Sequence, residues 1–258
     1  MTLVTMTIEN STAIVTIDNP PLNVMSQQVT KELSEIYRDC ENNSEVLSII
    51  LTGAGSRAFM AGADIKEFPE RIGKEGNLDY FMQTHAVLNQ LESVSKPVIA
   101  VLNGLTLGGG CELALTADIR IAEEHAQIGL PEIKLGLFPG GGGTQRLPRL
   151  IGAAKAKELM FLGDPISAKD AEKIGLVNKV AASGQGIEEA KKWAAKINGY
   201  SLQALSRIKQ AVNVGVGMPL QEGIELEARL FEEVFKTEDI KEGVQAFIEK
   251  RKPEFTNR

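Results

Sequence analysis

The sequence predicts an α/β fold, with a parallel sheet in its first part and a helical tail. Two short apolar runs rich in β-branched residues, 47–52 and 98–102, are typical of strands buried on both faces. Apolar residues recur at helical spacing over 29–40 and 78–94. Strands that alternate with helices in this way favour parallel β/α units.

The chain before the first helix is expected to form a hairpin. Residues 3–8 and 13–17 alternate between apolar and polar side chains on either side of a polar turn. Ser26 then has the position of a helix N-cap, and the helical pattern that follows it extends to Cys40.

Beyond residue 150 the pattern is mainly helical. A short strand is predicted at 177–180, and helices are predicted at 153–161, 168–174, 187–197, 202–214, 220–235 and 238–251. No linker rich in proline or serine divides the 258 residues. We therefore divide the chain by pattern, into a β/α core of residues 1–195 and a helical region of residues 196–258.

The composition excludes several classes of protein. Hydrophobic residues make up 43% and charged residues 24% of the chain, which is typical of a globular protein and not of a disordered one. The net charge of −6 argues against nucleic acids and anionic membranes as partners. The two cysteines are too few for a disulfide framework, the N-terminus lacks a signal-peptide pattern, and no apolar run reaches about 20 residues. We expect a cytoplasmic protein with reduced cysteines and no membrane span.

Glycines are concentrated in one part of the chain. Ten of the 25 lie between residues 104 and 143, which indicates sharp turns or close approach to a ligand. The turn at 108–110 leads into a short apolar helix, whose first N–H groups are suited to stabilising an oxyanion. Glu112 follows Gly109 by three residues. Glu112 is either buried with a raised pKa, as proton transfer requires, or exposed and stabilising the first helical turn; the sequence favours neither interpretation.

Glu132 is a second glutamate in an apolar setting, directly after Pro131. Two carboxylates at one pocket push their pKa values apart and can then serve as acid and base. A separation of 20 residues does not establish that Glu112 and Glu132 meet, so their proximity stays open at this point.

Other patterns in the sequence give no support for a nucleotide site, a histidine-based mechanism or a metal site. Residues 53–58 fit the Gly-x-Gly-x-x-Ala pattern of dinucleotide sites, but the residues that follow favour a bent loop. His85 lies beside leucines on a predicted helix, and His125 follows two glutamates in a predicted exposed turn. The sequence has no Gly-x-Ser-x-Gly elbow, no His-x-x-x-His pair and no paired cysteines, so neither histidine chemistry nor a metal is expected.

Taken together, five segments resemble the enoyl-CoA hydratase/isomerase (crotonase) superfamily, and within it the short-chain enoyl-CoA hydratases. They occur in family order over nearly the whole chain, at residues 19–23, 59–66, 103–112, 131–147 and 238–255. The resemblance implies a crotonase-type spiral core, each turn of which has two strands and a helix, followed by a C-terminal helical trimerisation region. It also implies a homo-oligomer, either a trimer or a dimer of trimers.

The resemblance further implies an activity and its catalytic residues. The substrate would be an acyl thioester of coenzyme A, and the reaction would be hydration of a trans-2-enoyl-CoA to a 3-hydroxyacyl-CoA in fatty acid β-oxidation. No cofactor is expected, because coenzyme A is part of the substrate. The N–H groups of Ala63 and Gly109 match the family's oxyanion hole. Glu112 would orient water and accept its proton, Glu132 would deliver a proton to the α-carbon, and the N–H of Gly140 would help to order the site.

Eight further positions match coenzyme A contacts of the family. Phe247 and Lys250 match positions that reach the coenzyme A of a neighbouring subunit, although Phe247 fits a core residue equally well. The others are Leu22, Val24, Ala61, Asp64, Ile65 and Lys66, and a solvated role suits Lys66 equally well. Residues 68–80 match the family pattern least and leave the acyl chain length open.

Three alternatives to hydration remain. A double-bond isomerase of the same family often works with one carboxylate, so the presence of both Glu112 and Glu132 favours the hydratase. Another crotonase-type reaction, such as decarboxylation or thioester hydrolysis, is the second alternative. The third is a binding protein without catalysis, but the acidic charge and the lack of a basic, aromatic-rich patch argue against RNA.

Overall fold

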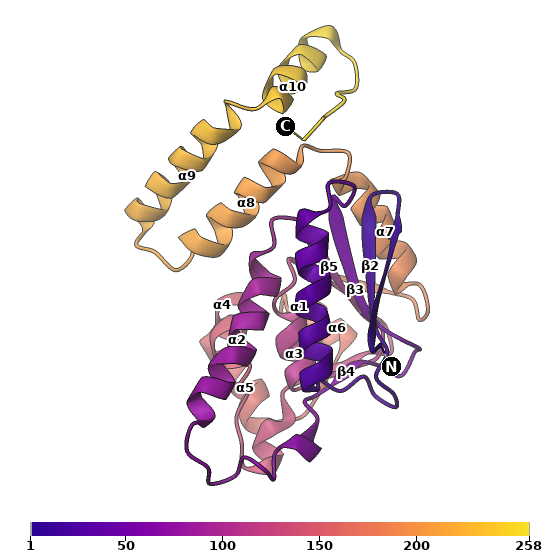
Figure 1. Cartoon of the computed structure of the whole chain (residues 1–258), viewed down its shortest axis with the longest axis vertical. Helices are drawn as coiled ribbons and strands as arrows, with labels where there is room; N and C mark the ends of the chain where they lie inside the picture. Colours follow the sequence, from indigo (N-terminus) through magenta and orange to yellow (C-terminus); the bar gives the residue numbers. More distant parts are fainter. Residues whose placement is uncertain (1, 258) are drawn as a thin grey trace.

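The computed structural model describes residues 2–257, and its larger sheet has the strand order β1-β2-β3-β5-β7-β10 (Figure 1). All neighbouring strands are parallel except β1 and β2, which form the expected hairpin. The strands of this sheet are β1 Val4–Glu9, β2 Thr12–Ile17, β3 Ser48–Gly53, β5 Val98–Leu102, β7 Ile119–Glu123 and β10 Lys179–Ala181.

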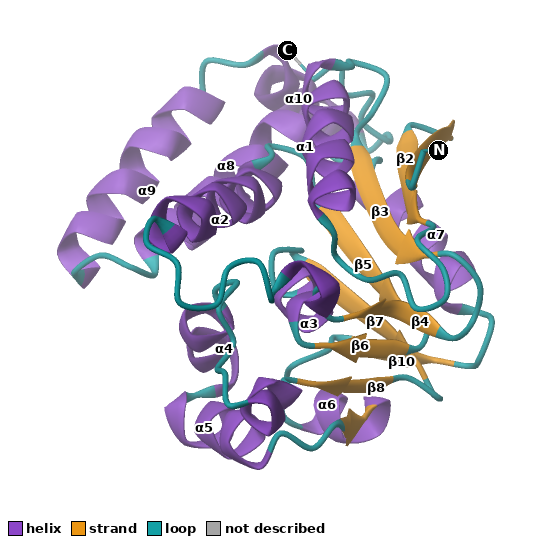
Figure 2. Ribbon diagram, turned by 60° about the horizontal axis from the view of Figure 1, so that its bottom comes forward, coloured by secondary structure: helices purple, strands orange, loops and turns teal. Residues whose placement is uncertain are grey.

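A second, smaller sheet lies beside the first (Figure 2). Each of its first three strands follows a strand of the larger sheet along the chain, so the chain passes repeatedly from one sheet to the other. This repetition produces the expected spiral of strand-strand-helix turns. The strands, in the order β4-β6-β8-β9, are β4 Ala58–Ala61, β6 Leu105–Leu107, β8 Gln127–Gly129 and β9 Ile166–Ser167.

Helices pack on both faces of the larger sheet (Figure 2). The helix α1, Gln27–Asn42, begins after Ser26, whose side chain accepts a hydrogen bond from Val29 N–H as expected of an N-cap. It packs against α2, Asn77–Ser93, and buries an apolar face that includes Leu33. On the other face of the sheet, α7, Gly186–Ile197, packs Ala190 and Ala194 against the strand residues Ile50, Ile99, Val101 and Ile121.

Shorter elements connect the strands, and three longer helices end the chain. The shorter ones are η1 Ile65–Glu67, α3 Gly109–Ala114, η2 Pro131–Leu135, α4 Gly143–Ile151, α5 Ala153–Leu162 and α6 Ala168–Lys173, of which η1 and η2 are 3₁₀ turns. The last three are α8 Leu202–Gly215, α9 Leu220–Val234 and α10 Glu238–Glu249, which project from the rest of the molecule in Figure 1. No helix within residues 2–257 is long and apolar enough to cross a lipid bilayer.

The boundary expected after residue 195 lies in the last turn of α7. The side chain of Lys209 on α8 is buried and forms a 2.9 Å ion pair with Asp118, which also accepts a hydrogen bond from Val98 N–H. The projecting helices are therefore attached to the sheet by a buried polar contact.

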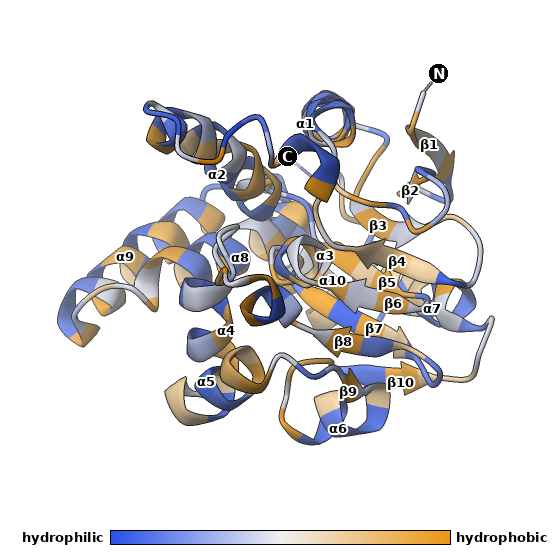
Figure 3. Cartoon of the chain, turned by 90° about the horizontal axis from the view of Figure 1, so that it is seen from below, coloured by the Kyte–Doolittle hydropathy of each residue, from blue (hydrophilic) through white to orange (hydrophobic). Residues whose placement is uncertain are grey.

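Hydrophobic residues are concentrated on the strands, whereas hydrophobic and hydrophilic residues alternate along α9 (Figure 3). The helices and strands expected for the first 102 residues are present, and so are the six helices expected after residue 150. The last expected strand begins two residues later, at Lys179. The smaller sheet and α4 were not predicted. On α2, Phe81 and Met82 are 49% and 55% exposed, so the apolar face predicted for this helix is not wholly buried.

Candidate active site

Two backbone N–H groups come together where α3 begins. Gly108 turns the chain into α3 with a φ of +52°, a conformation that favours glycine. Gly109 is the first residue of α3, so its N–H has no partner within the helix. A Cβ atom on Gly109 would lie 3.5 Å from the backbone nitrogen of Ala63. The two N–H groups of the expected oxyanion hole are therefore neighbours.

Ala63 is held in place by an extended segment beside it. Met25 N–H donates to the Gly62 carbonyl and the Met25 carbonyl accepts from Asp64 N–H, both at 2.8 Å. These bonds form a parallel bridge between Met25 and Ala63 that does not use the Ala63 N–H. This N–H consequently stays available to a ligand.

Glu112 is only 4% exposed, so the interpretation as an exposed helix-stabilising residue is wrong. Its Oε1 accepts hydrogen bonds from the N–H groups of Gly141, at 2.7 Å, and Gly143, at 2.8 Å. Gly143 is the first residue of α4, so the positive end of that helix faces the carboxylate. Burial raises the pKa of Glu112, while the two N–H groups and the charge of Arg146 act in the opposite direction.

Glu132 lies in η2, which begins at Pro131. Its Oε2 is buried and has no hydrogen-bond partner within residues 2–257. Its Oε1 would lie 3.0 Å from a Cβ atom on Gly108, which places this carboxyl at the start of α3. Burial, and then the nearby charge of Glu112, raise the pKa of Glu132 to about 7. The two carboxyl groups therefore share one site, which answers the question that their spacing in the sequence left open.

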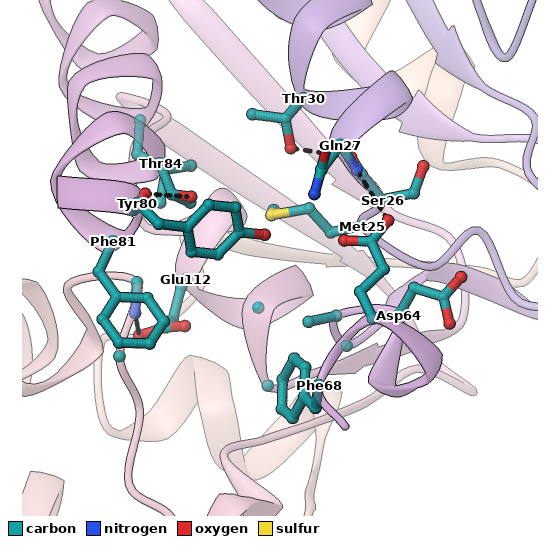
Figure 4. Close-up of a pocket in the computed structure, with 18 of the residues that line it drawn as sticks. Met25, Ser26, Gln27, Thr30, Asp64, Phe68, Tyr80, Phe81, Thr84 and Glu112 are labelled. Carbon is teal, nitrogen blue, oxygen red and sulfur yellow. Dashed lines mark hydrogen bonds between the residues drawn. The ribbon is translucent and has the colours of Figure 1, made fainter. Parts of the chain in front are cut away.

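All five expected catalytic positions line one cavity of about 1390 Å³. Figure 4 shows Met25, Phe68, Tyr80 and Phe81 on the walls of this cavity, with Glu112 among them. The other four expected positions that line it are Ala63, Gly109, Glu132 and Gly140. Gly140 directly precedes the two glycines whose N–H groups bind Glu112.

The positions expected to bind coenzyme A fall into three groups. Ala61, Asp64 and Ile65 line the cavity. Leu22 lies in the turn that precedes Met25 and Val24 directly follows that turn, and the Leu22 carbonyl accepts from Ala61 N–H at 3.0 Å. The others lie outside the residues that line the cavity: Lys66 is exposed on η1, Lys250 caps the C-terminus of α10, and Phe247 on α10 is 86% exposed. Phe247 is therefore not a core residue.

The patterns judged weak in the sequence have structural explanations. Residues 53–58 join β3 directly to β4, so no helix follows them and the interpretation as a bent loop is confirmed. His125 is exposed in the turn after β7, where its Nδ1 lies 2.9 Å from Ser183 Oγ. His85 is half-buried and lines the cavity.

Sequence reasoning missed several residues of this site. Gly141 and Gly143 hold Glu112, and Arg146 lies behind them. The run of four glycines from 140 to 143 was the available signal, because tight backbone approach to a carboxylate leaves no room for side chains. The aromatic residues of α2 gave no signal of their own.

An α/β spiral that places two N–H groups and two buried carboxyl groups in one cavity defines an enzyme site for anionic transition states. The family model described as enoyl-CoA hydratase/isomerase matches residues 7–258. The chain belongs to this family.

Individual relatives are similar over almost their full length. The short-chain-enoyl-CoA hydratase of Clostridium acetobutylicum is 46% identical over 252 residues, which cover 97% of this chain and 96% of that protein. The crystal structure of an enoyl-CoA hydratase from Bacillus anthracis has a TM-score of 0.94 at 37% identity, covering 99% of this chain and 100% of that one. A hydratase structure from Polaromonas has a TM-score of 0.92 at 30% identity, covering 98% and 99%.

The raised pKa of Glu132 predicts a pH-dependent effect on stability. The folded state favours the protonated carboxyl, so the stability associated with it is present below pH 4.5 and is lost as the pH rises toward about 7. We expect Glu132→Gln to raise the thermal midpoint relative to the unchanged protein more at pH 8 than at pH 5. Glu124→Gln, at an exposed position in a turn, is the control. Its thermal midpoint should differ from that of the unchanged protein by the same amount at pH 5 and at pH 8. Equal effects of Glu132→Gln at pH 5 and pH 8 would contradict the buried, raised state of this group.

Proposed function

We propose that the protein adds water to the double bond of trans-2-enoyl-CoA thioesters and releases 3-hydroxyacyl-CoA. The observation that carries the proposal is the presence of two carboxyl groups with raised pKa values in the cavity that also presents Ala63 and Gly109. Relatives at 46% and 37% identity carry the name enoyl-CoA hydratase, which supports the same reaction.

The two N–H groups account for activation of the thioester. When their hydrogen bonds reach the thioester oxygen, they stabilise the enolate that forms as water adds to C3. Each such donor contributes roughly 10²- to 10³-fold in rate. Because both donors belong to the backbone, at the start of α3 and beside the Met25 bridge, they are oriented before the substrate arrives.

The carboxyl groups account for the proton transfers. Ionised Glu112 takes one proton from the attacking water, whose oxygen forms the new bond to C3. Protonated Glu132 gives its proton to C2 as the electron pair returns from the enolate oxygen. The pair therefore holds one proton in total before and after the reaction, and the atoms of one water molecule are added. The raised pKa of Glu132, about 7, keeps much of this group protonated near neutrality.

The cavity wall supports a fatty acyl substrate. Met25, Phe68 and Phe81 provide apolar surface close to Glu112 (Figure 4). An acyl chain that extends from the thioester along this wall would leave room for water between the chain and the carboxyl groups of Glu112 and Glu132. No cofactor enters the proposed reaction, because water is the second substrate and coenzyme A is part of the first. Conversion of an enoyl thioester to a 3-hydroxyacyl thioester supports a role in fatty acid β-oxidation.

The proposed activity is tested by incubating the protein with crotonyl-CoA in H₂¹⁸O and, separately, in D₂O. Hydration predicts loss of the enoyl absorbance, ¹⁸O at C3 in the first solvent and deuterium at C2 in the second, as measured by mass spectrometry. No conversion of crotonyl-CoA or longer 2-enoyl-CoAs by folded protein would refute the proposal. Conversion of a 3-enoyl-CoA to a 2-enoyl-CoA without ¹⁸O incorporation would instead identify a double-bond isomerase.

We also infer that the protein is a homo-oligomer of three or six chains joined through α8–α10. These projecting helices and their C-terminal caps expose many large apolar side chains, and the rings of Phe231 and Phe235 lie against each other. Exposed apolar patches of this kind mark sites of protein–protein contact. The exposed side chains include Val216 at 65% exposed, Leu220 at 81%, Phe231 at 62% and Phe235 at 59%.

We expect light scattering to give three or six times the chain mass of 27.9 kDa. Phe231→Asp should lower that mass, because it places a charge on an apolar contact. Glu232→Gln, at the next position of α9, should leave the mass unchanged. A wild-type mass of 27.9 kDa would exclude the assembly.

A further inference from the structure

The side chain of Arg146 connects the glycine loop that holds Glu112 to the helix α2. Arg146 lies in α4, and its Nη1 donates to the Gly141 carbonyl at 3.3 Å. Its Nε and Nη2 donate to one carboxylate oxygen of Glu92 at 3.0 and 2.8 Å, and Nη2 also donates to Asn89 Oδ1 at 2.7 Å. Its side chain is 13% exposed. One guanidinium group therefore binds both the loop and two side chains of α2.

The loop on the other side of this contact encloses Glu112. A Cβ atom on Gly141 would lie 2.6 Å from Glu112 Oε2, and one on Gly143 would lie 3.0 Å from Oε1. Gly142, between them, has a φ of +102°, and a Cβ atom there would overlap Nη1 of Arg146. The carboxylate is thus packed on one side of the loop and the guanidinium on the other.

We propose that Arg146 is a positioning residue for the hydration reaction, because it fixes residues 141–143 so that their N–H groups hold the Glu112 carboxylate toward the water site. This inference rests on the proposed function. Arg146 itself does not line the cavity, so it acts on the reaction through the loop and not through the substrate.

The geometry requires arginine and not merely a positive charge. Nη1 of the rigid guanidinium fork reaches the Gly141 carbonyl of the loop, whereas Nε and Nη2 reach the side chains of α2. A lysine ammonium is a single point and cannot make these bonds in the same arrangement. Lysine would retain the positive charge near Glu112 but would lose the hydrogen bonds that hold residues 141–143.

The test compares Arg146→Met, Arg146→Lys and Arg149→Met in steady-state hydration of crotonyl-CoA. Arg149 is the matched control, because it lies in the same helix and its side chain donates to Gln145 and to no other residue within 2–257. We expect Arg146→Met to lower kcat by about 10- to 100-fold, the usual consequence of displacing a catalytic group by about 1 Å. KM should change less than about threefold, because Arg146 lies outside the cavity.

The pH profile provides a readout that a purely structural role would not move. The groups that interact electrostatically with Glu112 include Glu132 on η2, Cys111 on α3 and Arg146 on α4, and His85 on α2 lines the same cavity. Removal of the Arg146 charge should shift the acidic limb of kcat/KM to higher pH, since this charge favours ionised Glu112. Compared with Arg146→Met, Arg146→Lys should bring the acidic limb of the pH profile closer to its original position than it brings kcat to its original value.

The outcomes separate the two levels of the proposal. If the unchanged protein does not hydrate crotonyl-CoA, the proposed function fails. If it does, but Arg146→Met matches Arg149→Met in kcat and in the acidic limb, the role of Arg146 is refuted. Should Arg146→Met fail to fold, Glu92→Gln decides: we expect at least a threefold lower kcat at constant KM, and an unchanged kcat overturns the inference.

Discussion

Replacing Glu132 by Gln is expected to lower kcat for hydration of crotonyl-CoA by roughly 10²- to 10⁴-fold, the usual contribution of a general acid. Glutamine retains the shape of the side chain but has no proton of suitable acidity for C2. Because Glu132 Oε2 has no hydrogen-bond partner among residues 2–257, the substitution breaks no bond made by that oxygen. We therefore expect the variant to fold and to bind the thioester, with KM within a few-fold of its original value.

Glu112→Gln should lower kcat by a similar factor for a different reason. Its Oε1 accepts from Gly141 and Gly143 N–H, and an amide oxygen can still accept both bonds. The amide cannot take a proton from water, so the side chain stays in place while its catalytic role is lost.

The two variants are compared with Glu124→Gln, which changes an exposed glutamate in a turn. Stopped-flow or steady-state loss of the enoyl absorbance gives kcat and KM for all three. The double variant of residues 112 and 132 should lose little beyond the larger single effect, because the carboxyl groups act as a unit. If either single variant retained more than about a tenth of the original kcat, the assignment of that carboxyl group to proton transfer would be wrong.

The parts of the fold that the sequence predicts are those with a local signal. β3 and β5 are buried along their whole length and contain the apolar runs 49–51 and 98–102, and α1 begins after a capping serine. The strands β6 and β8 contain three residues each, too few to show a period of two. Gly143 and Pro148, which disfavour helices, hid α4 from sequence-based prediction.

The same holds for the site: residues with a local sequence signal could be predicted, and residues brought together by folding could not. The turn at 108–110 and the glutamate after it are adjacent in sequence, so their joint role was predictable. Glu112 and Glu132 line one cavity only in the folded chain, so their spacing in the sequence could not show that they meet. The resemblance to a family supplied this pairing. Arg146 gave no signal, because its partner Glu92 lies 54 positions away and on another helix.

Gly110→Ala is expected to remove most of the activity although it leaves both carboxyl groups of the proposed proton transfers unchanged. Gly110 lies in α3 against β4, where a Cβ atom would overlap the carbonyl oxygen of Met60. Neither backbone can yield without moving α3, and overpacking of this kind costs about 1–3 kcal/mol of stability.

The effect on kcat is expected to be larger than the effect on stability, because α3 contains two groups of the proposed site. Gly109 N–H and Glu112 lie on either side of Gly110, so a shift of α3 by about 1 Å would move both from the thioester and lower kcat by about 100-fold. Gly243→Ala on α10 is the control, because its Cβ would meet Phe255 at an ordinary 3.4 Å. Thermal denaturation and crotonyl-CoA kinetics should show losses for Gly110→Ala alone. A Gly110→Ala protein of undiminished kcat would mean that catalysis tolerates movement of α3, and the preorganised pair of N–H groups would then not explain the rate.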